Sequence, residues 1–297
     1  MVLVVYGLME GPRWLYYWQA KEVVDVCRKE VPATMKKKEI RKRYGTASRE
    51  DVLHRFFVLP ERIQDKEVVL GEEAHQIRDV LRLKAGARII VLDNEGWEYE
   101  AKLKVVGRSE VRGKVVEKRE ATGEPGVRIT LYQSLLAREK FELVLQKCTE
   151  VGVAGFVPVI TERSVVRDSG IKASRLGRWR RIIQEAAEQS HRGRLPELAA
   201  PVRFEDALEG LDGFDMSLVA SPEAKGKSLR ECLRGPGTAG TVALFVGPEG
   251  GFTENEVRQL CGGGAIAFSL GERILRTETA AVVASSVILY EMGELEG

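Results

Sequence analysis

Three short stretches of the sequence place glycine, proline and charged residues directly after apolar runs. They are VASPEA at 219–224, VGPEGG at 246–251 and SLGERILRTET at 269–279. Glycine lets a backbone approach a ligand closely and accepts positive φ, and proline stiffens a loop while removing one N–H donor. Such stretches offer backbone N–H and C=O groups to a flat, hydrogen-bonding ligand such as adenine. One of them alone would indicate a tight turn, but three together favour a binding site.

Several other kinds of site are excluded or disfavoured by the sequence. No G-x-G-x-x-G follows the first strand of the α/β region, and neither a phosphate-binding P-loop motif nor a G-x-S-x-G nucleophile motif occurs. The four cysteines and three histidines are scattered, which argues against a metal site and a disulfide framework. No apolar run reaches the roughly 18 residues of a membrane-spanning helix, and the first residues lack the basic segment and the long apolar core expected of a signal peptide. We therefore expect no metal and no membrane association.

The three stretches belong to a region in which predicted strands and helices alternate. Near-continuous apolar strands are typical of a parallel sheet that is covered on both faces. In an open sheet of this kind, ligands bind beyond the carboxyl ends of the strands, so the three stretches are expected to meet there. Strands are predicted at 127–135, 155–161, 214–221, 241–247 and 265–271. Helices are predicted at 138–152, 172–190, 253–261 and 277–292.

The preceding region, 52–122, has a different pattern. It contains several short runs rich in β-branched and aromatic residues, with NEG at 94–96 as a turn signal and one helix predicted at 72–83. Many short strands with little helix indicate a small barrel. The segment 121–126, ATGEPG, is typical of a linker. The sequence thus predicts an N-terminal extension at 1–51, a β-barrel domain at 52–122 and an α/β domain at 127–297.

Charge gives a weaker indication of the partner. The formal net charge is only +2, but residues 163–194 hold nine basic and three acidic residues. A local basic segment can bind a phosphate backbone. It can equally be the solvated face of a helix, and the charge alone does not decide between the two.

The motifs LFVGPEGGFTENEV and LGERILRTETA closely resemble those of the SPOUT-class methyltransferases, specifically the bacterial family that methylates N3 of a uridine in 16S ribosomal RNA. The resemblance extends over 54–293. It includes HRFFV and HQIRDVLRLKAG in the barrel region, and REKFELVLQKCTEVGV and EAAEQSHRGRLPEL in the α/β region.

The resemblance implies an architecture and a reaction. The fold would be a PUA-like barrel followed by an α/β domain with a trefoil knot. The activity would be S-adenosylmethionine-dependent methylation of a uridine in the small ribosomal subunit, carried out by a cytoplasmic homodimer. A buried interface between two copies would suit the final helix, whose middle is apolar almost all round. Two alternatives stay open, namely a SPOUT enzyme acting on a ribose 2′-hydroxyl or another base, and a non-catalytic RNA-binding protein.

Residue by residue, the resemblance also implies a site. The residues expected to bind the cofactor are Ala220, Ser221, Gly247, Glu249, Gly250, Leu270, Gly271, Ile274, Leu275 and Arg276. Arg276 is the candidate for stabilising negative charge on the uracil, and Glu278 is a weaker candidate for the base. Glu278 could instead simply favour the helix dipole in a first turn. The candidates for RNA binding are Arg55, Arg78, Arg82, Arg192 and Arg194.

Residues 1–51 have no counterpart in this resemblance, which leaves two hypotheses. An over-extended reading of the gene would place the true start at Val52 or Leu53. Alternatively, the extension is a genuine basic arm that adds RNA affinity through KKKEIRKR at 36–43, and the aromatic cluster around Trp14 and Trp18 favours a folded element.

Overall fold

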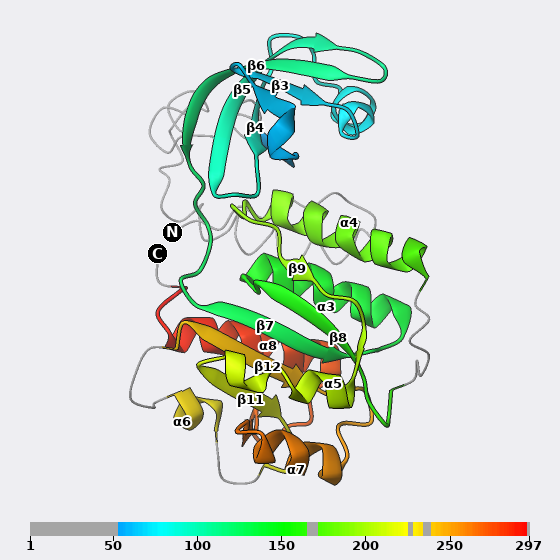
Figure 1. Ribbon diagram of the computed structural model, residues 1–297, viewed down its shortest axis with the longest axis vertical. Coiled ribbons are helices and arrows are strands. Elements are labelled where there is room, and N and C mark those ends of the chain that lie inside the picture. The colour runs from blue at the N-terminus through cyan, green and yellow to red at the C-terminus, as the bar shows by residue number, and fades with distance from the viewer. Residues whose placement is uncertain (1–52, 165–171, 225–227, 234–238, 296–297) are drawn as a thin grey trace, which may run out of the picture. The chain divides into compact units, whose positions relative to one another are not determined.

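The computed structural model of the protein describes residues 53–164, 172–224, 228–233 and 239–295. The predicted N-terminal extension, 1–51, lies outside the described residues, as does part of the basic segment. The described residues form two sheets that follow one another along the chain (Figure 1).

The first sheet has six strands in the order β1-β4-β5-β6-β3-β2. Its pairings are antiparallel except for β1 with β4, which is parallel. The strands are β1 (His54–Phe57), β2 (Ile63–Gln64), β3 (Glu67–Leu70), β4 (Arg88–Leu92), β5 (Trp97–Val106) and β6 (Val111–Glu120), and a 3-10 turn (Pro60–Arg62) precedes β2. Alternate side chains of these strands enclose one apolar core, which includes Phe56, Val68 and Leu103.

The helix predicted at 72–83 is much shorter in the structure. It is a π-helical segment, η2 (Gln76–Val80). Ile77 enters the core of the first sheet, whereas Val80 is 60% exposed. Arg82 adopts positive φ directly afterwards, which explains why a regular α-helix cannot continue to residue 83.

The second sheet is parallel, as the apolar runs predict. Its order is β10-β8-β7-β12-β11-β13, and β9 pairs with β8. Every pairing in it is parallel. The strands are β7 (Arg128–Ser134), β8 (Gly155–Ile160), β9 (Glu197–Leu198), β10 (Val202–Arg203), β11 (Met216–Ala220), β12 (Thr241–Val246) and β13 (Ile266–Phe268).

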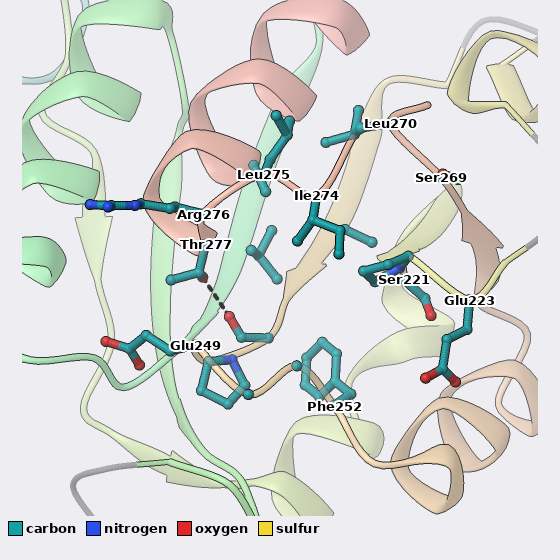
Figure 2. Close-up of a pocket in the computed structure, with 18 of the residues that line it drawn as sticks. Ser221, Glu223, Glu249, Phe252, Ser269, Leu270, Ile274, Leu275, Arg276 and Thr277 are labelled. Atoms are coloured by element: carbon teal, nitrogen blue, oxygen red, sulfur yellow. Dashed lines mark hydrogen bonds between the residues drawn. The ribbon is translucent and has the colours of Figure 1, made fainter. Parts of the chain in front are cut away.

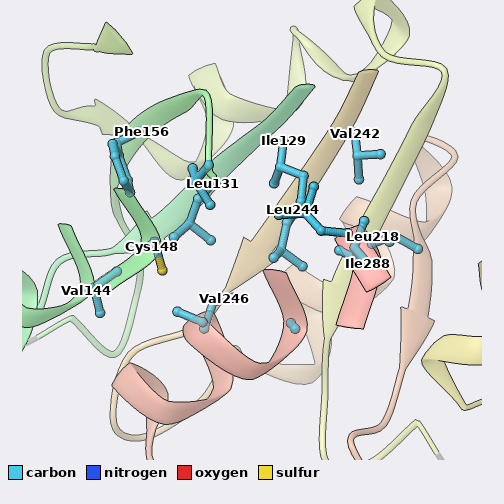
Figure 3. Close-up of a cluster of buried hydrophobic side chains, with 14 of the residues drawn as sticks. Ile129, Leu131, Val144, Cys148, Phe156, Leu218, Val242, Leu244, Val246 and Ile288 are labelled. Carbon is cyan, nitrogen blue, oxygen red and sulfur yellow. The ribbon is translucent and has the colours of Figure 1, made fainter. Parts of the chain in front are cut away.

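Helices cover both faces of this sheet, because alternate residues of its central strands point to opposite sides. Val242 and Leu244 of β12 belong to one apolar core, whereas Ala243 and Phe245 belong to another. Figure 3 shows the first core, to which α8 contributes Ile288. The helices are α3 (Arg138–Val151), α4 (Ala173–Gln189), α5 (Phe204–Leu208), α6 (Leu229–Leu233), α7 (Glu254–Gly262) and α8 (Thr277–Glu291), with a 3-10 turn at Leu211–Gly213.

The order of strands brings the three unusual stretches together. Strand β11 lies between β12 and β13 and is parallel to both, so the three strands end at the same edge. The stretches at 219–224, 246–251 and 269–279 follow these strands. The prediction that they meet at one edge of the sheet is therefore confirmed by the topology.

Candidate functional site

A cavity of about 680 Å³ lies at the carboxyl edge of β11, β12 and β13. All the residues expected to bind a cofactor line this cavity: Ala220, Ser221, Gly247, Glu249, Gly250, Leu270, Gly271, Ile274, Leu275 and Arg276. Glu278 lines it as well. The three strand exits therefore form one site, and its size falls in the range of roughly 300–1,000 Å³ that small-molecule sites occupy.

The exit from β12 is a compact loop that only glycine can build at two positions. A Cβ atom added to Gly247 would lie 2.9 Å from the backbone nitrogen of Phe252, closer than real Cβ contacts. Gly251 has φ +69° and donates its N–H to the carbonyl of Pro248 at 2.9 Å. The loop then enters α7 through a capping box, in which Thr253 and Glu256 bond to each other's backbone N–H groups.

The exit from β13 leads into α8 and forms the opposite wall. Gly271 has φ +98°, and the side chain of Ile274 is 88% exposed at the cavity. Figure 2 shows Leu270, Ile274 and Leu275 grouped on one side of the pocket, above the ring of Phe252. Apolar side chains above and an aromatic ring below make this part of the cavity suited to a flat, weakly polar group.

A hydrogen-bond network joins the two exits beneath the cavity. Thr277 donates its hydroxyl to the carbonyl oxygen of Gly247 at 2.5 Å, the contact drawn as a dashed line in Figure 2. The side-chain amide of Gln133, at the end of β7, donates to the Thr277 hydroxyl at 3.2 Å. The start of α8 is thereby fixed to the end of β12.

Charged side chains hold the exit of β12 from outside. Lys140 of α3 pairs with Glu249 at 2.9 Å, and Arg163 donates to the carbonyl oxygens of Gly250 at 2.9 Å and Phe252 at 3.4 Å. Burial alone would raise the pKa of Glu249, but Lys140 and nearby backbone N–H groups outweigh it, so the pKa lies below its usual value. Glu249 is thus held as an anion whose charge is already paired.

Arg276 and Glu278 lie side by side at the start of α8. Arg276 is the N-cap residue of α8, is exposed, and has no side-chain partner among the described residues. Figure 2 shows its side chain extending away from Ser221 and Glu223, on the side of the pocket where Glu249 lies. Glu278 is partly buried, and its Oε2 atom has no hydrogen-bond partner within the described part of the chain. The Arg276 guanidinium is thus free to contact a ligand, whereas the Oε2 atom of Glu278 is buried at the cavity wall.

The structure gives two of the candidate RNA-binding arginines other roles. Arg192 is only 2% exposed, and its guanidinium bonds to the Glu124 carboxylate at 2.6 and 3.0 Å and to the carbonyl oxygens of Thr149 and Val153. Arg55 has a side chain that is 9% exposed, and it donates to the buried Glu98 carboxylate at 2.5 Å. Neither guanidinium is accessible to a phosphate, so for these two the prediction of an RNA contact is corrected.

The other three arginines expected to bind RNA are at least partly exposed to solvent. Arg194 is exposed and donates to the carbonyl oxygen of Glu95 at 2.9 Å. Arg78 is paired with Asp79. Arg82 is exposed and has no hydrogen bond or ion pair among the described residues. Of the five arginines, Arg82 is thus the most available to a phosphate.

Sequence reasoning missed several residues of this site. Lys140, Arg163, Glu223, Phe252 and Thr277 line the cavity, and Gln133 lies beneath it. Phe252 and Thr277 stand inside the motifs already singled out, so their position was a usable signal. Lys140 and Arg163 belong to segments that the sequence singles out for other reasons, and Gln133 belongs to a predicted strand. Their roles at the cavity depend on partners that lie more than 80 residues away along the chain.

Two further features concern the described residues, namely metal-binding clusters and membrane-spanning helices. Those residues contain no group of three or more metal-binding side chains, and none of their helices is long and apolar enough to cross a membrane.

Comparison with known proteins identifies the kind of domain that carries this cavity. Residues 123–289 match the model of an RNA methyltransferase domain, and residues 69–116 match an RNA methyltransferase PUA domain. The expected barrel domain of PUA type is thereby confirmed.

Individual relatives cover most of the chain. The ribosomal RNA small subunit methyltransferase E of Bacillus subtilis is 34% identical over 254 residues, which are 82% of this chain and 99% of that protein. A methyltransferase E structure from Neisseria gonorrhoeae, bound to S-adenosyl methionine, is 32% identical with a TM-score of 0.71, covering 80% of this chain and 98% of that one. A Legionella pneumophila methyltransferase in complex with the cofactor SAM has the same identity and coverage, with a TM-score of 0.74. The chain therefore belongs to the ribosomal RNA small subunit methyltransferase E family.

Proposed function

We propose that this protein transfers a methyl group from S-adenosylmethionine to N3 of a uridine in 16S ribosomal RNA of the small ribosomal subunit. The observation that carries the proposal is the single cavity built by the three strand exits. Relatives at 32% identity, with similar folds, bind S-adenosylmethionine, and a relative at 34% identity is named for small-subunit RNA methylation. A ribosomal RNA substrate supports a cytoplasmic location for the enzyme.

The cavity fits this cofactor on its own chemistry. The apolar wall of Leu270, Ile274 and Leu275 with Phe252 beneath suits an adenine ring. Gly271 carries no side chain, and a Cβ added to it would meet nothing within 4 Å, so the backbone there is open to the edge of the ring. The carboxylates that line the cavity, such as that of Glu223, can accept hydrogen bonds from the amino and hydroxyl groups of the cofactor. When bound, S-adenosylmethionine supplies an electrophilic methyl group on its sulfonium.

The residues of the chain then have two tasks, positioning and charge stabilisation. Holding N3 of the uracil in line with the methyl group can contribute on the order of 7–11 kcal/mol to lowering the barrier. The proton on N3 must leave, and the resulting negative charge spreads over O2 and O4. In this proposal the guanidinium of Arg276 stabilises that charge, and the carboxylate of Glu278, which also lines the cavity, accepts the proton.

The RNA is gripped by cations around the cavity and on the barrel domain. Lys140, Arg163, Arg273 and Arg276 all line the cavity, so phosphates flanking the target uridine have partners there. The barrel domain, 52–122, contributes Arg82 and Arg78, and Arg194 stands near it in the α/β domain, 127–297. The uridine must leave its stack to reach the methyl group, at a cost of a few kcal/mol.

The active unit is a homodimer, and the α/β domain contains the trefoil knot of the SPOUT class. The surface of helix α8 supports the proposal of a dimer, because Tyr290 near the end of the helix is 60% exposed. Leu143 of the adjacent helix α3 is 42% exposed. These two exposed side chains are the apolar surface that a second copy would cover in the proposed dimer.

Nucleoside analysis after a methylation assay tests the function. Small ribosomal subunits from cells that lack their own enzyme are incubated with the protein and isotopically labelled S-adenosylmethionine, and the RNA is digested and analysed by mass spectrometry. Label on N3-methyluridine is expected. Label on a ribose or another base would replace the proposed target, and RNA binding without cofactor binding in calorimetry would refute an enzymatic role.

A further inference from the structure

Gln133 is a buried polar residue whose side chain reaches the undersides of two loops. Gln133 is the last residue but one of β7, which ends at Ser134, and it is 1% exposed. Its Nε2 atom lies 3.2 Å from the Thr277 hydroxyl oxygen, 3.3 Å from the carbonyl oxygen of Val246 and 3.4 Å from that of Gly247. A fourth oxygen, the carbonyl of Ser134, lies at 3.2 Å.

The chemistry of these neighbours fixes the orientation of the amide. Carbonyl oxygens only accept hydrogen bonds, so the nitrogen of Gln133, and not its oxygen, must face them. The Thr277 hydroxyl gives its own proton to Gly247, which leaves its oxygen free to accept from Gln133. Gln133, Thr277 and Gly247 therefore form one directional network.

The partners of Gln133 are the points at which two walls of the cavity begin. Val246 and Gly247 start the exit from β12, and Thr277 follows Arg276 at the start of α8. All four of these residues line the cavity, whereas Gln133 does not. Any influence of Gln133 on a ligand must act through the loops that it holds.

The amide also leaves one of its own atoms unsatisfied. Its Oε1 is buried and has no hydrogen-bond partner among the described residues. An apolar side chain of the same size would avoid this penalty, in a region that already packs Leu135, Leu136 and Val246 together. For packing alone, the amide of Gln133 is therefore less favourable than an apolar side chain of the same size. What the amide provides in return is its hydrogen bonds to the two loops.

We propose that Gln133 is a positioning residue for methyl transfer, which sets the distance between the β12 exit and the start of α8 and so aligns the cofactor wall with Arg276. The inference rests on the proposed function. A misplacement of about 1 Å can lower a rate by about 10²-fold, so a residue that fixes two walls of a site can matter without touching the ligand.

The test is Gln133→Met, which keeps the length of the side chain and removes the donor. The expected result is a fall of about 10-fold or more in kcat together with weaker S-adenosylmethionine binding, measured well below the midpoint of thermal unfolding. Thr277→Val should behave similarly, Thr277→Ser should retain more activity than Thr277→Val, and the double variant Gln133→Met/Thr277→Val should be little worse than either single one. Gln259→Met, an exposed position on α7 away from the cavity, is the matched control.

Hydrogen exchange in the cofactor-free protein separates this proposal from the proposed function. Gln133→Met should speed exchange at the amides of 247–252 and 276–280 and leave the first sheet unchanged, whatever reaction the enzyme performs. Wild-type kcat and cofactor affinity in a folded variant, or faster exchange throughout the chain, would overturn the positioning role. Failure of the wild-type protein to methylate subunits would overturn the proposed function, and with it the catalytic part of the inference, while the exchange result would still report on the loops.

Discussion

The guanidinium of Arg192 and the carboxylate of Glu124 form a two-point ion pair, with N–O distances of 3.0 and 2.6 Å. Arg192 follows α4, and Glu124 lies in the segment between the two sheets. The Oε1 atom of Glu124 also accepts hydrogen bonds from the backbone N–H groups of Gly193 and Arg194. The segment expected to be a simple linker is thereby anchored to the α/β region by a buried cation.

Arg192→Met is predicted to destabilise the fold and not to act on RNA binding directly. Removing the guanidinium takes the counter-charge from Glu124, which keeps only the N–H groups of Gly193 and Arg194, and it takes one hydrogen bond each from the carbonyls of Thr149 and Val153. Breaking a buried ion pair in this way costs about 3–5 kcal/mol. Urea denaturation measures this loss. Arg181→Met, at an exposed position on α4, is the control and should change stability by about 0.5 kcal/mol or less. An Arg192 variant of normal stability with a smaller salt dependence of RNA binding would restore the phosphate role.

Arg276→Ala is predicted to lower kcat by about 10²-fold or more, because a cation at the developing charge acts mainly in the transition state. Cofactor affinity, measured by calorimetry, should change much less. Arg258→Ala on the exposed side of α7 serves as the control for loss of one positive charge. Near-normal turnover by Arg276→Ala would remove Arg276 from the reaction.

Glu188 makes stability depend on pH. Burial raises its pKa from 4.5 to about 7, although its Oε1 accepts from the Gln184 amide and the Phe57 N–H, while Glu73 and Glu185 raise it further. A carboxyl whose folded pKa is raised holds its proton better in the native state. The stabilisation that Glu188 provides is therefore complete below its unfolded pKa near 4.5. As the pH rises toward 7, the free energy of unfolding falls by up to about 3 kcal/mol.

Glu188→Gln removes this titration while keeping an oxygen that can accept from Phe57. The variant is predicted to be more stable than the wild type at pH 8 and similar to it at pH 4.5, as measured by urea denaturation across that range. Glu185→Gln, an exposed neighbour on α4, should leave most of the slope in place. Identical pH profiles for Glu188→Gln and wild type would show that Glu188 is charged in the native state.

Glu256→Ala is predicted to destabilise the exit of β12. The carboxylate accepts from the N–H of Thr253 at 2.7 Å and from the N–H of Glu162 at 2.9 Å, and Glu256 is 4% exposed. Leaving two such donors unsatisfied costs about 1–3 kcal/mol each. Thr253→Ala, which removes only the cap, should cost about 1 kcal/mol. Thermal unfolding of both variants checks the order, and an equal effect would mean that the Glu162 contact contributes nothing.

Tyr290→Glu is predicted to convert a dimer into a monomer, because a charge would be buried in the proposed apolar interface. Sedimentation at micromolar concentration measures the change. Val116→Glu is the control, since Val116 of β6 is apolar and 56% exposed but lies on the first sheet. A wild-type protein that is a stable and active monomer would contradict the dimer itself.

The sequence by itself determined the features that depend on neighbouring residues. Apolar runs identified five strands of the parallel sheet, whereas the two-residue strands β9 and β10 were not predicted. The helix predicted from residue 253 begins with a capping box, whose two members, Thr253 and Glu256, are only three residues apart. Two of the strand exits were recognisable by their glycines. Gly247 leaves no room for a Cβ atom, and Gly271 has a positive φ, so both conditions favour glycine at those positions. Those exits do line one cavity.

Only the tertiary structure decided which polar side chains meet one another. Arg192 reaches a carboxylate 68 residues away, and Gln133 reaches a hydroxyl 144 residues away. An arginine is equally compatible with a phosphate contact and a buried ion pair, and the choice depends on whether packing leaves its guanidinium exposed. Burial and long-range partners arise only when the strands align, and no local pattern of residues encodes them.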